Sequence, residues 1–331
     1  MDLEVRHLRI ICAIEEAGSL SRAAAALRLT QPGLSTQLRR IEGMLGGSLF
    51  DRTSSGAVPT PFGEVVLTRA RAVLPTIDDL LGTAALAARG TGCFRLGSIN
   101  SPLLGGVIAA IRERHPGGRI TSRGQSSPNP LLDDIAQGRL EAAVVGDSPG
   151  YELAHRAGMV FEPVVTEPVF VALPAGHRLA AQEQVELADL AGEDWVSPPP
   201  DDDRTREYWH GVFLTTGARM RTTHEAEGRL LLELVRSGHA VSLCQATFEE
   251  VPGIAVRPIG GDPLWYRHVL AWHQDGPVAA IGPAVVEQAR AAYGRAARRS
   301  AAYRRWSERT GAGRVGTGRT AERQGRDAPR P

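Results

Sequence analysis

Polar and basic side chains share one face of a segment near the N-terminus. A helix over residues 31–45 would bury its apolar residues, which recur at helical spacing: Leu34, Leu38, Ile41 and Leu45. Its other side and N-terminal tip carry the polar set: Gln31, Pro32, Ser35, Thr36, Arg39 and Arg40. Gln and Arg make paired hydrogen bonds to base edges in the major groove, and short hydroxyl side chains allow close approach. The pattern predicts a DNA-reading helix, with a plain helical bundle as the alternative.

A second polar group follows two candidate strands in the middle of the chain. Ser98, Asn100 and Ser101 lie at the end of the strand expected over residues 94–99, and Gln125, Ser126 and Ser127 follow the strand expected over 119–124. Ligands of open α/β sheets bind outside the carboxyl ends of the strands. Backbone N–H groups of the helices that begin there suit an anion. These residues are candidate contacts for a small anionic ligand, or else ordinary loop and cap residues.

Several kinds of chemistry have no counterpart in the chain. The sequence has no G-x-G-x-x-G after a strand, no P-loop, no H-E-x-x-H and no G-x-S-x-G. The three cysteines, Cys12, Cys93 and Cys244, lie far apart, without metal-ligand or redox spacing. We therefore expect no catalytic residues, no metal and no cofactor.

Composition places the chain among globular proteins and leaves one unusual segment. Of 331 residues, 42% are hydrophobic and 23% are charged, with a net charge of +1. No run approaches the roughly 18 apolar residues of a bilayer span, and no secretory signal is evident, so a cytoplasmic protein without a membrane partner is expected. Residues 295–331 carry 11 Arg against 3 acids. This Gly- and Arg-rich tail is expected to be disordered, either adding phosphate contacts or serving as a passive solubilising arm.

The elements that must position these residues fall into two patterns. Before residue 93, helices are expected over 5–17, 20–27, 31–45 and 61–88, with a short hairpin formed by 49–53 and 57–58. The fourth helix carries apolar residues at alternating spacings of four and three, which predict a dimer seam or, alternatively, a core stripe: Val66, Ala70, Val73, Ile77, Leu80 and Ala84. Pro75 is expected to kink that helix or to break one of its hydrogen bonds.

Beyond residue 93, strands alternate with helices, which predicts parallel α/β sheets. Strands are expected over 94–99, 119–124, 142–146, 168–173, 240–244 and 255–259. Helices are expected over 102–114, 130–137, 204–213, 228–237 and 277–299.

Several sequence blocks in the first 71 residues occur in the order and at the spacing of the winged helix-turn-helix of LysR-type transcriptional regulators, which this part of the chain resembles. The blocks are Leu20–Ala24, Leu29–Ser35, Gln37–Glu42, Leu45–Gly46, Leu49–Arg52 and Thr60–Glu64. The resemblance extends more loosely to about residue 295. It implies a mainly α winged helix-turn-helix (1–60), a linker and dimerisation helix with a hinge (61–93), and an effector-binding domain (94–294). The last resembles periplasmic binding proteins, with two Rossmann-like α/β subdomains, about 94–165 plus 267–294 and 166–266.

The resemblance also implies roles for single residues. Gln31, Pro32, Ser35 and Thr36 would meet bases, with Arg39 and Arg40 on bases or phosphate. Arg52 would reach the minor groove from the wing, and the backbone would be held by Ser21, Arg22 and Thr60. Thr30, which the sequence predicts as the N-cap of the helix over 31–45, is a further candidate DNA contact. A solvated helix face is the alternative for Arg22, Arg39 and Arg40. In the effector domain, Ser197, Thr222 and His224 would close the cleft from the second subdomain. Gly33 departs from the family, which commonly has a side chain there.

The sequence thus predicts a regulator whose DNA binding or activation is modulated by an effector. Its expected partners are double-stranded DNA, a small anionic effector, further copies of itself as a homodimer or homotetramer, and RNA polymerase. A solute-binding protein with the same α/β half and no DNA-reading role is the alternative from another functional class.

Overall fold

The computed structural model describes all residues except 1, 54–55, 89–91, 200–203, 218 and 312–331, with the side chains of 52–53, 79, 83 and 85–88 also outside the description. It divides into two compact units, Met1–Thr91 and Gly92–Pro331. Each unit is described by itself.

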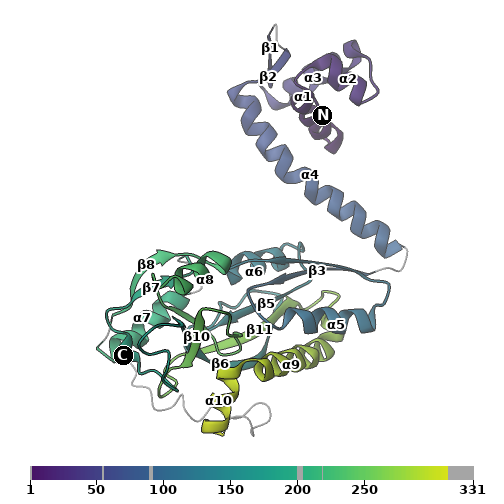
Figure 1. Ribbon diagram of the computed structural model, residues 1–331. Coiled ribbons are helices and arrows are strands. Elements are labelled where there is room, and N and C mark those ends of the chain that lie inside the picture. The colour runs from purple at the N-terminus through teal and green to yellow at the C-terminus, as the bar shows by residue number, and fades with distance from the viewer. Residues whose placement is uncertain (1, 54–55, 89–91, 200–203, 218, 312–331) are drawn as a thin grey trace. The chain divides into compact units, whose positions relative to one another are not determined.

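The first unit is a helical bundle with a two-stranded wing (Figure 1). It contains α1 (Val5–Ala17), α2 (Leu20–Ala26), α3 (Gln31–Leu45), β1 (Phe50–Thr53), β2 (Gly56–Pro59) and α4 (Pro61–Ala88). Its core joins Ile11, Ile14, Leu34, Ile41 and Leu67 from α1, α3 and α4. Gly56 has φ +136°, and a Cβ there would lie 2.1 Å from the Gly18 carbonyl oxygen. Only glycine therefore lets β2 approach the turn between α1 and α2 this closely.

The linker helix α4 runs through Pro75. Proline removes one backbone N–H and crowds the preceding turn, yet α4 continues as one helix from Pro61 to Ala88 through Pro75. The 28-residue length leaves many intact turns on both sides of this single missing donor. Pro75 therefore costs α4 one hydrogen bond, as expected, but does not end the helix.

The second unit is built on one seven-stranded sheet, in the order β10-β6-β11-β5-β3-β4, with β9 also paired to β6. Its strands are β3 (Cys93–Ser98), β4 (Arg119–Gly124), β5 (Ala142–Asp147), β6 (Met159–Pro174), β9 (Ser242–Gln245), β10 (Ile254–Pro258) and β11 (Trp265–His273). β3, β4 and β5 are parallel, whereas β11 is antiparallel to β5 and β6. A separate parallel pair is formed by β7 (Asp194–Ser197) and β8 (Arg221–Glu225).

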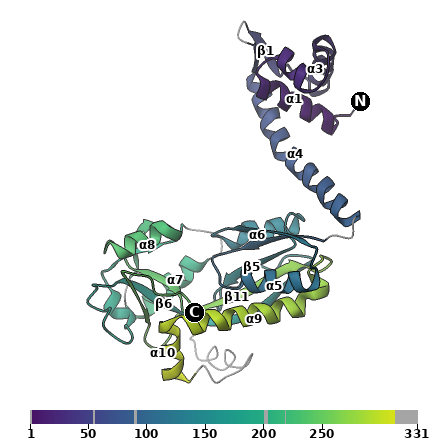
Figure 2. The ribbon, with the colours of Figure 1, turned by 45° about the vertical axis from the view of Figure 1, so that its right-hand side comes forward.

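Helices cover the sheets of this unit. They are α5 (Leu104–Arg114), α6 (Pro128–Ala136), η1 (Leu187–Leu190), α7 (Thr205–Thr215), α8 (Gly228–Arg236), η2 (Ala279–Ile281), α9 (Gly282–Arg299) and α10 (Ala301–Thr310). α5 and α9 run side by side (Figures 1 and 2). A Cβ at Gly106 of α5 would lie 2.3 Å from the Gln288 carbonyl oxygen of α9, so the glycine permits this close packing.

The strands β6 and β11 connect the two halves of the second unit, one of which contains β3, β4 and β5 and the other β7, β8, β9 and β10. β6 pairs with β11 along residues Met159–Pro168 and with β9 and β10 along its C-terminal part. β11 also pairs with β5. The sequence predicted only residues 168–173 of β6 and missed β7, β8 and β11. The central residues of β11 are all buried, so its sequence does not alternate between apolar and polar residues. The alternation that marks a half-buried strand is therefore missing from Trp265–His273.

The expectation of a disordered segment from residue 295 onward is wrong for residues 295–310. α9 continues to Arg299, and α10 follows with Ser300 as its N-cap. Ala302 and Trp306 are buried with Phe170, Ala246 and Val256, and Trp306 Nε1 donates to Asp262 Oδ1 at 2.9 Å. Two apolar side chains four residues apart therefore anchor a helix that also contains three Arg, Arg304, Arg305 and Arg309. The predicted tail beyond residue 311 lies outside the described residues.

Candidate DNA interface and effector cleft

The polar face of α3 is exposed, with one exception. Gln31, Pro32, Thr36, Arg39 and Arg40 are exposed, and Leu34, Leu38 and Ile41 are buried on the other side. Ser35 is only 8% exposed, so its placement on the polar face is wrong. It adjoins Leu34 on the side of α3 that packs against the bundle. Gln37, which was not among the predicted contacts, is exposed on this helix.

Three of the residues predicted to contact DNA form hydrogen bonds within the protein. Thr30 Oγ1 accepts from the Gly33 N–H at 3.3 Å and caps α3. Thr60 Oγ1 donates to the Ser48 carbonyl at 2.6 Å and accepts from the Gly63 N–H at 2.9 Å. Arg22 Nε donates to the Ala17 carbonyl at 2.8 Å.

The cap also accounts for Gly33, because a Cβ there would lie 2.9 Å from Thr30 Oγ1. Ser21 is exposed in the first turn of α2. On the wing, Arg52 pairs with Ala57 through the backbone, and its side chain lies outside the described residues.

The predicted dimer seam of α4 divides into two parts. Ala70 is 2% exposed and belongs to the core of its own chain, with Val66 packed against it. The seam prediction is wrong for Ala70, since α1 packs on this stretch of α4. Ile77 is half-buried, whereas Val73, Leu80 and Ala84 are exposed. Large apolar side chains exposed on α4 are Phe62, Val65, Val73, Leu80 and Leu81.

In the second unit, the first group of predicted effector contacts meets at the carboxyl ends of β3 and β4. The Gln125 N–H donates to the Ser98 carbonyl at 3.0 Å. Ser98 is buried, and its hydroxyl donates to the Ile99 carbonyl at 2.6 Å, so it is occupied by the backbone. Ser101 is half-buried, and Asn100, Gln125 and Ser126 are exposed.

The other half of the unit contributes a second group. Ser197 Oγ lies 3.5 Å from Thr222 Oγ1, and His224 pairs with Val196 through the backbone of β8. Side-chain hydrogen bonds also join these two groups of residues. Gln245 Nε2 donates to the Asn100 carbonyl at 3.0 Å, and Ser126 Oγ donates to Glu227. Gln245 and Glu227 were missed by sequence reasoning because such contacts join residues more than a hundred positions apart.

One buried hydroxyl in this region has no bond within the protein. Ser127 Oγ is buried and has no hydrogen-bond partner in the part of the chain that the structure describes. Buried polar groups without a partner are uncommon in native proteins. The atom is therefore available to a water or a ligand.

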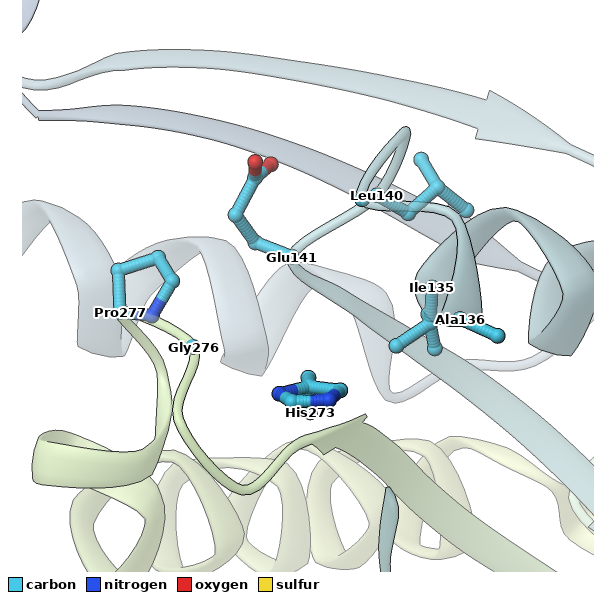
Figure 3. A pocket seen from close by; sticks show the side chains of 8 residues that line it. Ile135, Ala136, Leu140, Glu141, His273, Gly276 and Pro277 are labelled. Carbon is cyan, nitrogen blue, oxygen red and sulfur yellow. The ribbon is translucent and has the colours of Figure 1, made fainter. Parts of the chain in front are cut away.

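A pocket of about 270 Å³ lies elsewhere in the second unit (Figure 3). Leu140, Glu141, His273 and Pro277 contribute to its lining, and it contains none of the predicted effector contacts. Glu141 directly precedes β5, so the pocket lies at the opposite edge of the parallel strands from Ser98 and Gly124. The Glu141 carboxylate is held by Arg95 at 2.7 Å.

The three cysteines are poorly suited to reaction, and the described residues contain no candidate membrane span or metal site. Burial raises the pKa of the Cys12, Cys93 and Cys244 thiols, which disfavours the reactive thiolate. Within the described ranges, no helix combines the length and apolar character needed to cross a bilayer. The same residues hold no group of three or more His, Cys, Asp or Glu arranged to bind a metal.

Comparisons with known proteins cover most of the chain. The family described as "Bacterial regulatory helix-turn-helix protein, lysR family" matches residues 5–64, and "LysR substrate binding domain" matches residues 87–294. The Small neutral protease regulatory protein of Streptomyces coelicolor is 42% identical over 290 residues, which is 86% of each chain. The regulator GbpR of Rhizobium radiobacter is 33% identical over 65% of this chain and 71% of its own.

A solved structure of full-length CbnR in complex with its target DNA has the same fold. It matches with a TM-score of 0.66 and 21% identity, covering 88% of this chain and all of that chain.

Proposed function

Because the chain belongs to the LysR family of DNA-binding transcriptional regulators, we propose that Gln31, Pro32, Thr36, Arg39 and Arg40 of α3 read the bases of its operator. The observation that carries this proposal is their common exposure on a helix whose opposite side is buried. Gln37 extends the same surface. Arg52 on the wing reaches the minor groove, and Ser21 contacts a phosphate.

The regulator acts as a homodimer or homotetramer in this proposal. The exposed residues Val73 and Leu80 of α4 continue the heptad spacing and supply an apolar surface for a second copy. Two copies present two DNA-reading helices, which a two-part operator requires.

The effector cleft lies at the carboxyl ends of β3 and β4. Asn100, Ser101, Gln125 and Ser127 line it from one half, and Ser197, Thr222 and His224 from the other. The unpartnered hydroxyl of Ser127 supports ligand binding here. The effector is small and anionic, and its binding shifts the population between DNA-bound assemblies. The protein acts in the cytoplasm, where RNA polymerase is a further partner, and catalyses no reaction of its own.

The names of the relatives indicate which target gene to examine first. Three regulators that are 37–42% identical carry the name Small neutral protease regulatory protein. A gene for a small neutral protease, or the gene beside that of this regulator, is therefore the first target to examine.

The test is DNase footprinting of the full-length protein on the intergenic regions on both sides of its own gene. We expect a protected site, and Arg39→Ala should abolish protection. The exposed Arg112 of α5 provides the control, because Arg112→Ala removes an arginine from the second unit. No protected site on either flank would contradict the proposed target, and equal effects of both substitutions would contradict the role of α3.

A further inference from the structure

A glutamate and a histidine are enclosed between β6 and β11, where the two halves of the second unit join. Glu167 and His268 are both 0% exposed, and His268 Nε2 lies 2.6 Å from Glu167 Oε1. The register of the β6–β11 pair shifts directly after His268, so the two side chains lie beside a bulge in the strands that connect the halves.

The Glu167 carboxylate is satisfied by neighbours from three elements. Besides His268, its oxygens accept from the Thr247 N–H at 3.1 Å and from Tyr293 OH of α9 at 3.3 Å. A buried ionisable pair of this kind is seldom required for stability, since apolar residues of similar volume commonly do as well. Its presence therefore suggests a role beyond packing.

One member of the network reaches the cleft. His268 Nδ1 lies 3.2 Å from Ser101 Oγ, which also accepts from the Leu103 N–H at 3.3 Å. Ser101 is half-buried, whereas Glu167 and His268 are enclosed. A hydrogen-bonded chain thus runs from the junction of the two halves to a predicted effector contact.

The proton positions follow from the partners. Because the Glu167 carboxylate only accepts, Nε2 of His268 carries a proton. In the neutral imidazole, Nδ1 is then an acceptor, and the Ser101 hydroxyl donates to it. In the imidazolium, Nδ1–H donates to Ser101 Oγ, which releases the hydroxyl proton for a bond to another group.

We propose that His268 is a positioning residue of the effector cleft, which decides whether Ser101 offers the effector a hydrogen-bond donor or an acceptor. The inference rests on the proposed contact between Ser101 and the effector. An anionic effector oxygen can only accept, so Ser101 can donate to it and keep its bond to His268 only when the imidazole is protonated. Binding of an anion is then coupled to proton uptake at a histidine that the anion does not touch.

Two phenols and a thiol are further titratable groups beside the Glu167–His268 pair. Burial and the Glu167 carboxylate raise the pKa of Tyr293 well above its ordinary value, and burial raises the pKa of Tyr303. Burial also raises the pKa of the Cys244 thiol, which lies in the field of Glu167. The Tyr266 ring stands perpendicular to the imidazole, with centroids 5.0 Å apart. The Tyr293 and Tyr303 phenols and the Cys244 thiol therefore stay neutral near neutral pH.

The link between His268 and Ser101 can be tested without DNA or the natural effector. The full-length protein is labelled with ¹⁵N-histidine, and the signals of both ring nitrogens are followed from pH 5 to 8.5. His268→Gln identifies the signal among the nine histidines. We expect the neutral form to carry its proton on Nε2 and the Nδ1 signal to move in Ser101→Ala. Ser126→Ala, which alters a cleft serine bonded to Glu227 instead, should leave it unchanged. A proton on Nδ1, or the same Nδ1 signal in Ser101→Ala as in the unmodified protein, would overturn the proposal.

The coupling to anions is tested with acetate as the probe and acetamide as its neutral counterpart. Acetate should move the His268 titration midpoint to higher pH in the unmodified protein and not in Ser101→Ala, while acetamide should move it in neither. Acetate affinity should accordingly fall by up to about tenfold per pH unit as His268 loses its proton. An unmoved midpoint overturns the coupling. Failure of the proposed function is distinct, because it would show as unaltered operator binding by α3 variants, which these titrations do not measure.

Discussion

The polar face of α3 and the buried network of Glu167, His268 and Ser101 are two ways of placing functional groups. The α3 residues lie within ten positions of one another and are exposed together on one helix. The buried pair is separated by 101 positions, and Ser101 by a further 66 from Glu167. A local surface tolerates substitution of one member without loss of structure. A buried network does not, because each member is the hydrogen-bond partner of another, and its loss leaves a buried polar group unsatisfied.

The strongest test of this difference is Glu167→Ala. It leaves the enclosed His268 without its carboxylate, and removing one partner of a buried pair costs about 3–5 kcal/mol. Hydrogen exchange monitored by mass spectrometry should show lost protection in residues 92–310, with residues 5–88 little changed.

Glu183→Ala is the matched control, because Glu183 is exposed and such surface changes usually stay within about 0.5 kcal/mol. Equal loss of protection in both units would show that the two regions do not differ as described.

Assembly through α4 predicts the next largest effect. Leu80 is 66% exposed in the single chain, and Leu80→Asp would place an uncompensated charge in the dimer surface at a cost of about 3 kcal/mol or more. Light scattering should show dissociation, and operator affinity should fall because two half-sites are no longer held together.

Leu214 of α7 offers a control of similar exposure, 60%. Leu214→Asp should leave the mass unchanged. A wild-type mass for Leu80→Asp would assign the exposed residues of α4 to some other contact.

Base reading by α3 predicts a smaller effect that separates two neighbouring residues. Gln31→Ala should relax sequence preference, since a good base contact contributes about 1–3 kcal/mol of discrimination. Ser35 is buried, so Ser35→Ala should leave the preference unchanged. Competition binding against a set of single-base operator variants measures both. A relaxed sequence preference in Ser35→Ala and not in Gln31→Ala would mean that α3 presents Ser35, rather than Gln31, to the bases when the protein binds DNA.

Local patterns explain what the sequence could predict. The apolar spacing of Leu34, Leu38 and Ile41 defined the buried side of α3, and Thr30 was identified as its cap, as the structure confirms. Ser35 was assigned to the wrong side because it lies at the edge of the apolar stripe. Whether a residue at that edge is buried or exposed depends on how the neighbouring helices pack, which the spacing does not show.

Long-range packing explains what the sequence could not predict. No spacing connects Glu167 with His268, although each is a polar residue in a largely apolar stretch, with Val165 and Pro168 near Glu167 and Val269 next to His268. Such a residue requires a partner, and that rule indicates a buried network without identifying it. Ala302 and Trp306 were overlooked in the same way, because the Arg-rich composition around them outweighed two apolar positions.

The smallest expected effect concerns residues 312–331, which carry five Arg against two acids. α10 packs against the second unit through Trp306, so a deletion that tests the tail must begin after Gly311 and spare that helix. Each phosphate contact made by the tail would steepen the salt dependence of DNA affinity by about 0.9 in the log–log slope. We expect no change in slope or in non-specific affinity, because α3 and the wing already supply the DNA surface in this proposal. Affinity measured from 50 to 300 mM salt, on operator and on unrelated DNA, decides the matter. A slope that becomes shallower by about one or more would show that the tail joins α3 as a second, sequence-independent DNA contact.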